Sequence, residues 1–320
     1  MRIGIRTLAA AALLCGPCAG AASLIAPGTY FIEGEATPNR QPDGNSIVIA
    51  APQGLIVFDT GRHPEHMQEI LQFARMQDRP IAAIINSHWH LDHVGGNPRL
   101  RAAFPGIRVY ASSAIMAAHA GFLADYRAKL TAEIAESAKK PAAQESMRAE
   151  IALIDAGAAL DPTDVISKSA PMNIAGRELQ LHLESRAVTA GDVWVFDPAS
   201  RVLLAGDLVT LPAPFFESAC PARWRDSLAH LAKVRFDWLV PGHGRPLRPA
   251  EFTAYRKAFS HLLDCAAGDA RKDVCADSWL GDISGLLKEE DMSYARTLIG
   301  YYLDNYLRNP SERVRGFCAD

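Results

Sequence analysis

The chain has 320 residues, of which 49% are hydrophobic and 22% are charged. This ordinary globular composition excludes a disordered, a collagen-like and a long coiled-coil chain. The formal net charge is -3, whereas nucleic-acid binders usually carry a basic patch. No apolar run reaches the roughly 18 residues that a membrane span needs. We therefore expect one large two-layer enzyme domain or two smaller domains, with no nucleic-acid partner.

The first 21 residues have the pattern of a secretory signal. Two arginines precede a short apolar stretch at Leu8–Leu14, and small residues follow where a signal peptidase would cleave before Ala22. The alternatives are an N-terminal helix of the folded domain and a lipoprotein anchor at Cys18, which matches an anchor poorly. We predict a signal peptide over 1–21 and a periplasmic or secreted mature protein.

Four cysteines follow the predicted cleavage site: Cys220, Cys265, Cys275 and Cys318. An even count in an exported protein indicates disulfides, and four cysteines allow three connectivities. The short separation of Cys265 and Cys275 favours a local bridge. Cys220 would then pair with Cys318 and tie the C-terminus to the body. Four unpaired thiols remain the alternative, because spacing does not report geometry.

Strands and helices alternate along the first half of the mature chain. Turn residues such as Pro42-Asp43-Gly44 separate short extended stretches. We expect strands at 28–33, 46–50, 55–59, 81–86 and 108–111, and helices at 64–76 and 96–104. This alternation is typical of a layered α/β domain.

The alternation breaks between residues 112 and about 160, a segment rich in Ala, Glu and Lys that predicts two or more helices. Apolar side chains recur at every fourth position, at Phe122, Tyr126, Leu130 and Ile134. Such a stripe predicts packing on the body of the protein, and a lid over a site is the sharper alternative.

Strands are expected again at 178–183, 193–196, 202–205 and 238–240, with helices at 224–234 and 250–263. The tail from 278 to 309 is predicted to be mostly helical, with Leu298, Tyr301, Tyr302 and Tyr306 on a common face.

The most informative segment for function directly follows the predicted buried strand 81–86. It contains His88, His90, Asp92 and His93 within six residues, and two glycines come next. Imidazole and carboxylate are the common zinc ligands, and a turn at a strand end lets close neighbours converge. We predict that His88 and His90 face one metal while Asp92 and His93 face a second. A surface histidine cluster is the alternative, and placement after a core strand disfavours it.

These four residues match the motif H-x-H-x-D-H, and the sequence resembles the metallo-β-lactamase superfamily. Further similar segments are LIVFDTG at 55–61, AGD at 205–207 and VPGHG at 240–244. The resemblance implies a four-layer αββα sandwich over 22–264, with a helical insertion at about 112–160 and a helical C-terminal extension at 265–320. It also implies that Asp207 bridges two metals and that His243 is the C-terminal ligand.

One position departs from the family pattern, because Val188 stands where the family usually has a third histidine for the first metal. Along an extended strand His182 and Glu184 lie roughly 20 and 13 Å from that position, which is too far. His63 and His119 are freer candidates. A water is the other replacement, since catalytic zinc often has three protein ligands.

The resemblance implies metal-assisted hydrolysis with one or two zinc ions, with iron or manganese as alternatives. Bound metal lowers the pKa of water toward about 7, and Asp92 would orient the resulting hydroxide and shuttle its proton. Asp59 would orient a ligand histidine from behind, whereas Asp192 fits better as a turn residue. Because the first site lacks one imidazole, we predict that the second site binds metal more tightly.

We expect an exported hydrolase of a small-molecule ester, thioester, lactone, lactam or phosphoester. Asp207 resembles the glyoxalase II pattern more than that of β-lactamases with Cys or Ser at this position. One alternative is a degenerate binding protein that keeps the fold without turnover, for which Val188 is the main support. A mononuclear iron sulfur dioxygenase is the other, and Val188 argues against it.

Overall fold

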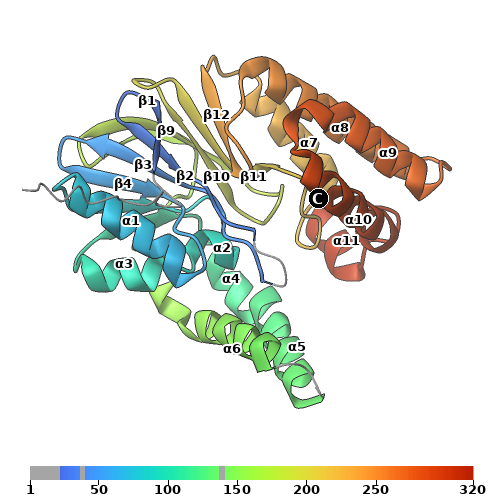
Figure 1. Cartoon of the computed structure of the whole chain (residues 1–320), viewed down its shortest axis with the longest axis horizontal. Coiled ribbons are helices and arrows are strands. Elements are labelled where there is room, and N and C mark those ends of the chain that lie inside the picture. Colours follow the sequence, from blue (N-terminus) through green and yellow to red (C-terminus); the bar gives the residue numbers. More distant parts are fainter. Residues whose placement is uncertain (1–21, 37–39, 137–140, 320) are drawn as a thin grey trace, which may run out of the picture.

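The computed structural model describes residues 22–36, 40–136 and 141–319, so the predicted signal peptide at 1–21 lies outside the described residues. The described strands form two sheets that face each other, and helices cover their outer faces (Figure 1). One sheet has the strand order β1-β2-β3-β4-β5-β6-β7 and the other the order β12-β11-β10-β9-β8. This is the predicted αββα arrangement, and it carries the expected helical insertion and C-terminal helices. The domain boundaries themselves stay a prediction.

The first sheet begins antiparallel and becomes parallel at β4. Its antiparallel strands are β1 (Ser23–Ala26), β2 (Thr29–Ile32), β3 (Ser46–Ala51) and β4 (Gly54–Phe58), and its parallel additions are β5 (Ile81–Ile85), β6 (Arg108–Ala111) and β7 (Asp164–Val165). Helices α1 (Pro64–Met76) and α3 (Asn97–Ala103) lie in the connections that follow β4 and β5. Because β4 and β5 are parallel, the loops after them start from the same edge of the sheet.

The second sheet contains one parallel pair of strands, β11 and β12, and these two strands contribute to the site described below. Its strands are β8 (Ala170–Ile174), β9 (Arg177–Glu184), β10 (Asp192–Asp197), β11 (Val202–Thr210) and β12 (Trp238–His243). All pairs are antiparallel except β11 with β12. The carboxyl ends of β11 and β12 therefore also share one edge.

Alternation along the strands builds the layers. In β3, Ile47 and Ile49 belong to the apolar cluster between the sheets, whereas Val48 belongs to the cluster under α1 and α3. In β11, Leu204 faces the sheet interface while Leu203 faces the helices on the other side. Successive side chains of a strand point to opposite faces, so one apolar strand serves both layers.

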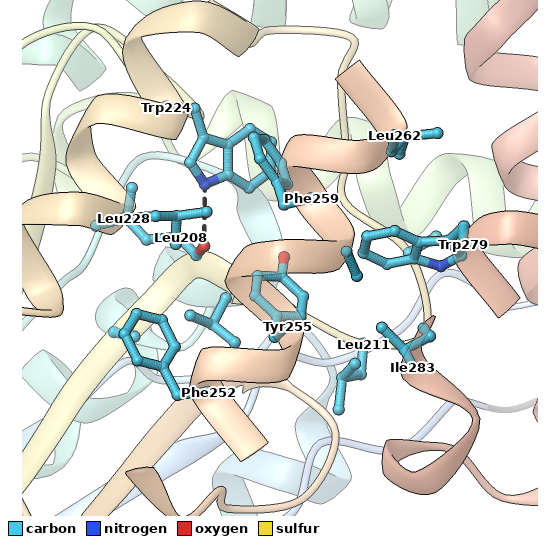
Figure 2. Packing of buried hydrophobic residues seen from close by; sticks show 14 of the residues in the cluster. Leu208, Leu211, Trp224, Leu228, Phe252, Tyr255, Phe259, Leu262, Trp279 and Ile283 are labelled. Carbon is cyan, nitrogen blue, oxygen red and sulfur yellow. Dashed lines mark hydrogen bonds between the residues drawn. The ribbon is translucent and has the colours of Figure 1, made fainter. Parts of the chain in front are cut away.

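The C-terminal helices cover the outer face of the second sheet. They are α7 (Pro221–Leu231), α8 (Pro249–Ala267), α9 (Lys272–Ile283), α10 (Met292–Tyr302) and α11 (Glu312–Cys318). Helices α7 and α8 pack against β11 and β12, α9 packs against α8, and α10 packs against α9. Figure 2 shows Trp224, Tyr255 and Phe259 packed together, with Trp279 nearby. Each large apolar side chain buried in this way contributes roughly 1.5–3 kcal/mol.

This helical layer is also hydrogen-bonded to the strand that carries Asp207. The indole Nε1 of Trp224 donates to the carbonyl of Leu208 over 2.9 Å, the dashed line in Figure 2. The backbone N–H of Thr210 donates to the hydroxyl of Tyr255 at 3.2 Å. The helices after β12 therefore support β11 directly, and they share one apolar core with it.

Both expected disulfide pairs are present in the structure. Cys265 and Cys275 join α8 to α9, and Cys220 and Cys318 join the start of α7 to the end of α11. Their Cα atoms lie 5.7 and 5.4 Å apart, respectively, within the normal range for a disulfide.

The insertion consists of α4 (Ala114–Ala120), α5 (Phe122–Glu136) and α6 (Pro141–Asp155). Its apolar residues Leu123 and Ile154 share a cluster with Trp89 and Leu91, which lie in the histidine-rich turn. Of the predicted stripe on α5, Leu130 is buried, and the other three side chains are half-buried. The insertion therefore packs on the body of the protein, against the turn that carries the metal motif.

Several elements differ from the sequence-based expectation. Strands β1, β7 and β8 were not predicted, because they are short edge strands with mixed polarity, and β8 contains Pro171. Helix α7 begins at Pro221 rather than at 224, since proline suits the first helical position. Three of the tail residues predicted to share a face lie together, since the ring centroids of Tyr301, Tyr302 and Tyr306 are 5.4 to 6.0 Å apart, but Tyr302 is buried and Tyr301 is 43% exposed.

Among the described residues, no helix combines the length and the apolar character needed to cross a membrane.

Candidate metal centre

The structure brings all six predicted ligand residues together at one edge of the two sheets. They are His88, His90, Asp92 and His93 from the turn after β5 and the short helix α2 (Leu91–Val94), Asp207 from β11, and His243 from the end of β12. These positions come from β5, β11 and β12, each of which pairs in parallel with a neighbour. The site is therefore built where parallel strands end, in both sheets at once.

The six residues form two groups of potential metal donors. The first donor group is His88, His90 and Asp207, and the second donor group is Asp92, His93 and His243. Within each group the ligand atoms lie within 4.8 Å of one another. All six side chains are buried or half-buried.

Asp207 lies between the two groups. Its Oδ2 is 3.6 Å from His88 Nε2 and 4.0 Å from His90 Nδ1. Its Oδ1 is 3.2 Å from His93 Nε2 and 3.6 Å from His243 Nε2. Each carboxylate oxygen therefore faces a different group.

Three buried atoms at this point lack a hydrogen-bond partner among the described residues: His88 Nε2, His93 Nε2 and Asp207 Oδ1. Buried polar atoms almost always have partners, and leaving one unsatisfied costs about 1–3 kcal/mol. Imidazole nitrogen and carboxylate oxygen are common ligand atoms of zinc in proteins. The residues present therefore fit one or two metal ions.

A comparison with protein families agrees with this geometry. Residues 40–243, more than half of the chain, match the family model described as the metallo-beta-lactamase superfamily. The chain belongs to the metallo-β-lactamase superfamily.

The sequence is also similar to those of individual proteins that are named for an enzymatic activity. The linear primary-alkylsulfatase of Pseudomonas sp. (strain ATCC 19151) is 27% identical over 225 residues, which cover 64% of this chain and 42% of that protein. The hydroxyacylglutathione hydrolase of Gloeobacter violaceus is 45% identical over 49 residues, which cover 15% of this chain and 19% of that protein. The chain thus spans less than half the length of either relative.

Solved structures show the same fold. A metallo-beta-lactamase from Pontibacter korlensis matches with a TM-score of 0.55 and 19% identity, over 75% of this chain and 98% of that chain. The sec-alkylsulfatase Pisa1 from Pseudomonas sp. matches with a TM-score of 0.57 and 19% identity, over 92% of this chain and 52% of that chain. At such identities the likeness is one of fold.

Asp59 lies behind His93, where the resemblance to the superfamily implied it. Its Oδ2 is 2.8 Å from His93 Nδ1, the ring nitrogen that faces away from the second donor group. The backbone N–H and the hydroxyl of Ser87 both donate to Asp59 at 2.7 Å, and the same hydroxyl lies 2.9 Å from His88 Nδ1. Asp59 and Ser87 thus orient one histidine in each donor group.

Ser218 orients His90, and it was not among the predicted site residues. Its hydroxyl lies 2.8 Å from His90 Nε2 and donates to the carbonyl of Val188 over 2.9 Å. The Val188 side chain is fully buried in the apolar cluster under the C-terminal helices. A lone serine in a loop between β11 and α7 carries no signal in the sequence that would have identified it.

The other histidines considered as replacement ligands have different partners. His63 Nδ1 lies 2.8 Å from a carboxylate oxygen of Asp43, and His119 Nε2 lies 2.8 Å from Asp161. The ring of His182 stacks on Trp194 with centroids 3.7 Å apart. In the described part of the chain none of the three belongs to either donor group. Asp192 accepts hydrogen bonds from Thr189, the turn role that the sequence favoured.

Gly44 and Asn45, which directly precede β3, form hydrogen bonds to the backbone around the second donor group. From the sequence this segment was expected only to be a turn. Gly44 donates its N–H to the Asp92 carbonyl over 3.1 Å, and Asn45 donates its own to Gly242 over 2.7 Å. The Asn45 side-chain amide also donates to the carbonyls of Pro241 and Gly244 at 2.9 and 2.8 Å. The turn around His243 is therefore held by a residue almost two hundred positions earlier in the chain.

Two glycines allow the close backbone approach that the site requires. A Cβ atom on Gly242 would lie 1.9 Å from Asp207 Oδ1. Gly206 has a φ of +52°, and a Cβ there would lie 2.5 Å from the Cβ of Ser87. Only glycine allows such a close approach, and the positive φ at Gly206, without strain.

The histidines of the two donor groups differ in the direction of their pKa shifts. Burial is the main reason that the pKa of His90 falls to about 4 and that the pKa of His88 lies well below its usual range. Burial also opposes the charged form of His93, but Asp207 and Asp59 outweigh it and raise the pKa of His93 well above its ordinary value. The first donor group therefore holds neutral imidazoles, which are the metal-binding form.

Proposed function

We propose that this protein is an exported, metal-dependent hydrolase of a small-molecule ester, with zinc as the metal. The observation that supports this most is the position of Asp207, with one carboxylate oxygen toward each donor group. His88, His90 and Asp207 would hold one ion, and Asp92, His93 and His243 the other, with Asp207 shared. Iron and manganese are the alternative metals.

Such ions, when bound, lower the pKa of water toward about 7 and polarise the substrate oxygen. The protein supplies a carboxylate that can orient this water. Asp92 Oδ2 lies 2.9 Å from His243 Nε2 at the centre of the site. Burial opposes ionisation of Asp92, but His93, His243 and Arg62 outweigh it and hold its pKa well below the ordinary value. Asp92 therefore stays ionised and would orient the attacking water by accepting a hydrogen bond from it.

The surroundings of the first donor group support a substrate with an apolar part. The ring centroids of Trp89, Phe215 and Phe122 lie 4.6, 5.1 and 6.5 Å from that of His90. Phe122 begins the insertion helix α5, and Phe215 lies in the loop after β11. An apolar group attached to the reacting ester would contact these rings. The alkylsulfatase relative adds a sulfate ester to the thioester, lactone, lactam and phosphoester classes expected from the sequence.

Export is supported by the two disulfides, because such bonds persist in oxidising compartments. The predicted signal peptide at 1–21 would deliver the chain there.

Two alternatives are less favoured. A degenerate protein that no longer bound metal would not need three unsatisfied buried atoms in its donor groups. An iron sulfur dioxygenase would need a third histidine in the first donor group, and at that position the Val188 side chain lies in an apolar cluster instead. Hydrolysis at a site with two ions therefore remains the function that the geometry supports best.

The test is the metal content of the purified mature protein, followed by assays of p-nitrophenyl acetate, p-nitrophenyl sulfate and bis-p-nitrophenyl phosphate. We expect about two zinc ions per chain, and activity that chelation removes and zinc restores. Asp207→Ala should lower metal content and reduce activity more than about 100-fold. One ion per chain would leave the second donor group as the sole centre. Two ions without turnover of any ester would favour the binding protein.

A further inference from the structure

A buried arginine links the metal site to the insertion. Arg62 follows β4, and only 8% of its surface is exposed. Its Nη1 donates to Oε2 of Glu150 on α6 at 2.5 Å, and its Nη2 donates to Oδ1 of Asp92 at 3.2 Å. Glu150 is itself buried, at 4% exposure. The guanidinium is thus held between a carboxylate of the insertion and a carboxylate of the second donor group.

This contact divides the two oxygens of Asp92 between different tasks. Oδ1 accepts from Arg62, while Oδ2 lies 2.9 Å from His243 Nε2 and 3.5 Å from His93 Nε2. A fixed partner on one oxygen leaves the other free to face the donor group. Partners of this kind orient metal ligands and tune their charge.

Glu150 sets the strength of the electrostatic attraction between Arg62 and Asp92. With Glu150 present, the guanidinium charge is shared between two carboxylates. Without it, Asp92 would be the nearest anion to a buried cation, and Arg62 would compete with a metal ion for the same carboxylate. The negative charge on α6 therefore keeps Asp92 available as a ligand.

Packing alone does not account for this pair. The insertion already rests on the histidine-rich turn through Leu123, Ile154 and other apolar residues. Replacing a buried ion pair with well-packed apolar side chains is often neutral or stabilising. The position of the pair against Asp92, rather than its contribution to stability, is what distinguishes it.

We propose that Glu150 is a positioning residue for the second donor group, acting through Arg62 to hold Asp92 with Oδ2 toward the metal. The helical insertion would then complete the metal site and not only cover it. This inference rests on the proposed binding of metal by the second donor group.

The test measures the zinc dissociation constants of the full mature chain by competition with a chromogenic chelator. Asp92→Asn shows which of the two constants belongs to the second donor group. Glu150→Gln keeps the shape and removes the charge, and we expect it to weaken that constant by about 10–100-fold. The other constant should change by less than about threefold. Glu145→Gln, on an exposed position of the same helix, is the matched control and should match the wild type.

A double variant, Arg62→Met with Glu150→Leu, separates positioning from folding. It removes both charges and restores apolar packing, so the metal-free variant should unfold at or near the wild-type temperature while binding the second ion more weakly. Wild-type affinity for both ions in Glu150→Gln and in the double variant would overturn the inference while leaving the proposed function intact. A wild-type protein that binds no ion at the second donor group would overturn both.

Discussion

Ser218 Oγ lies 2.8 Å from His90 Nε2, on the side of the ring that faces away from Asp207. This contact joins a loop residue to a histidine 128 positions away. In the same way Asp59 and Ser87 hold the outer nitrogens of His93 and His88. Every histidine of the H-x-H-x-D-H motif therefore has a polar partner behind it.

Removing the Ser218 hydroxyl should weaken the first donor group. Ser218→Ala leaves His90 Nε2 without this partner, and outer partners of this kind are worth about 10–100-fold in metal affinity. Chelator competition against zinc measures the effect. Ser218→Thr keeps a hydroxyl and should retain most of the affinity, and equal losses in both variants would contradict this role.

The Asn45 amide should stabilise the turn around His243. Asn45→Asp keeps the oxygen that accepts the N–H of Gly34 but removes both donors to Pro241 and Gly244. Leaving buried carbonyls without their donors costs about 1–3 kcal/mol. Urea unfolding of the metal-free protein should show a loss of that size. An unchanged free energy of unfolding would mean that other contacts hold the turn.

Gly242 should tolerate no side chain. In Gly242→Ala the new Cβ would lie 1.9 Å from Asp207 Oδ1 and 2.8 Å from the Gly206 backbone, so we expect about 1–3 kcal/mol of destabilisation and reduced metal content. Gly281→Ala is the matched control, because nothing lies within 4 Å of its Cβ position. At that helical position alanine should stabilise by about 0.5–1 kcal/mol. Thermal unfolding compares the two, and equal behaviour would contradict the argument.

Asp192 should make the metal-free protein less stable as the pH rises. Burial raises the pKa of this carboxyl from 3.8 to about 7. Its stabilising contribution is fully present below the unfolded pKa of 3.8. Between there and about 7 the unfolded chain releases the proton while the folded chain keeps it, so the free energy of unfolding falls. Above that range the contribution changes no further.

Asp192→Asn removes this titration. Because the amide cannot accept both hydrogen bonds from Thr189, the variant should be less stable than the wild type at pH 4, by about 1–3 kcal/mol. The difference should narrow by pH 8. Denaturant unfolding at a series of pH values measures it, and a constant difference would show that Asp192 does not titrate in this range.

The sequence alone was sufficient to predict the layers and the six residues that gather in the two donor groups. The H-x-H-x-D-H turn is local, so its meaning survives without knowledge of the fold. Apolar runs such as those of β4 and β11 are long enough to indicate buried strands. Short strands with polar and proline residues, such as β8, were missed because their pairing comes from neighbours rather than from their own pattern.

What the sequence by itself determined is therefore the chemistry of the donors, because the residue types alone fix which atoms can bind a metal. Only the tertiary structure decided which groups stand behind them. Asn45 reaches Gly244 across 199 positions, and Arg62 reaches Glu150 across 88. Such contacts depend on two sheets and an insertion packing against one another, and no periodicity along the chain records that packing.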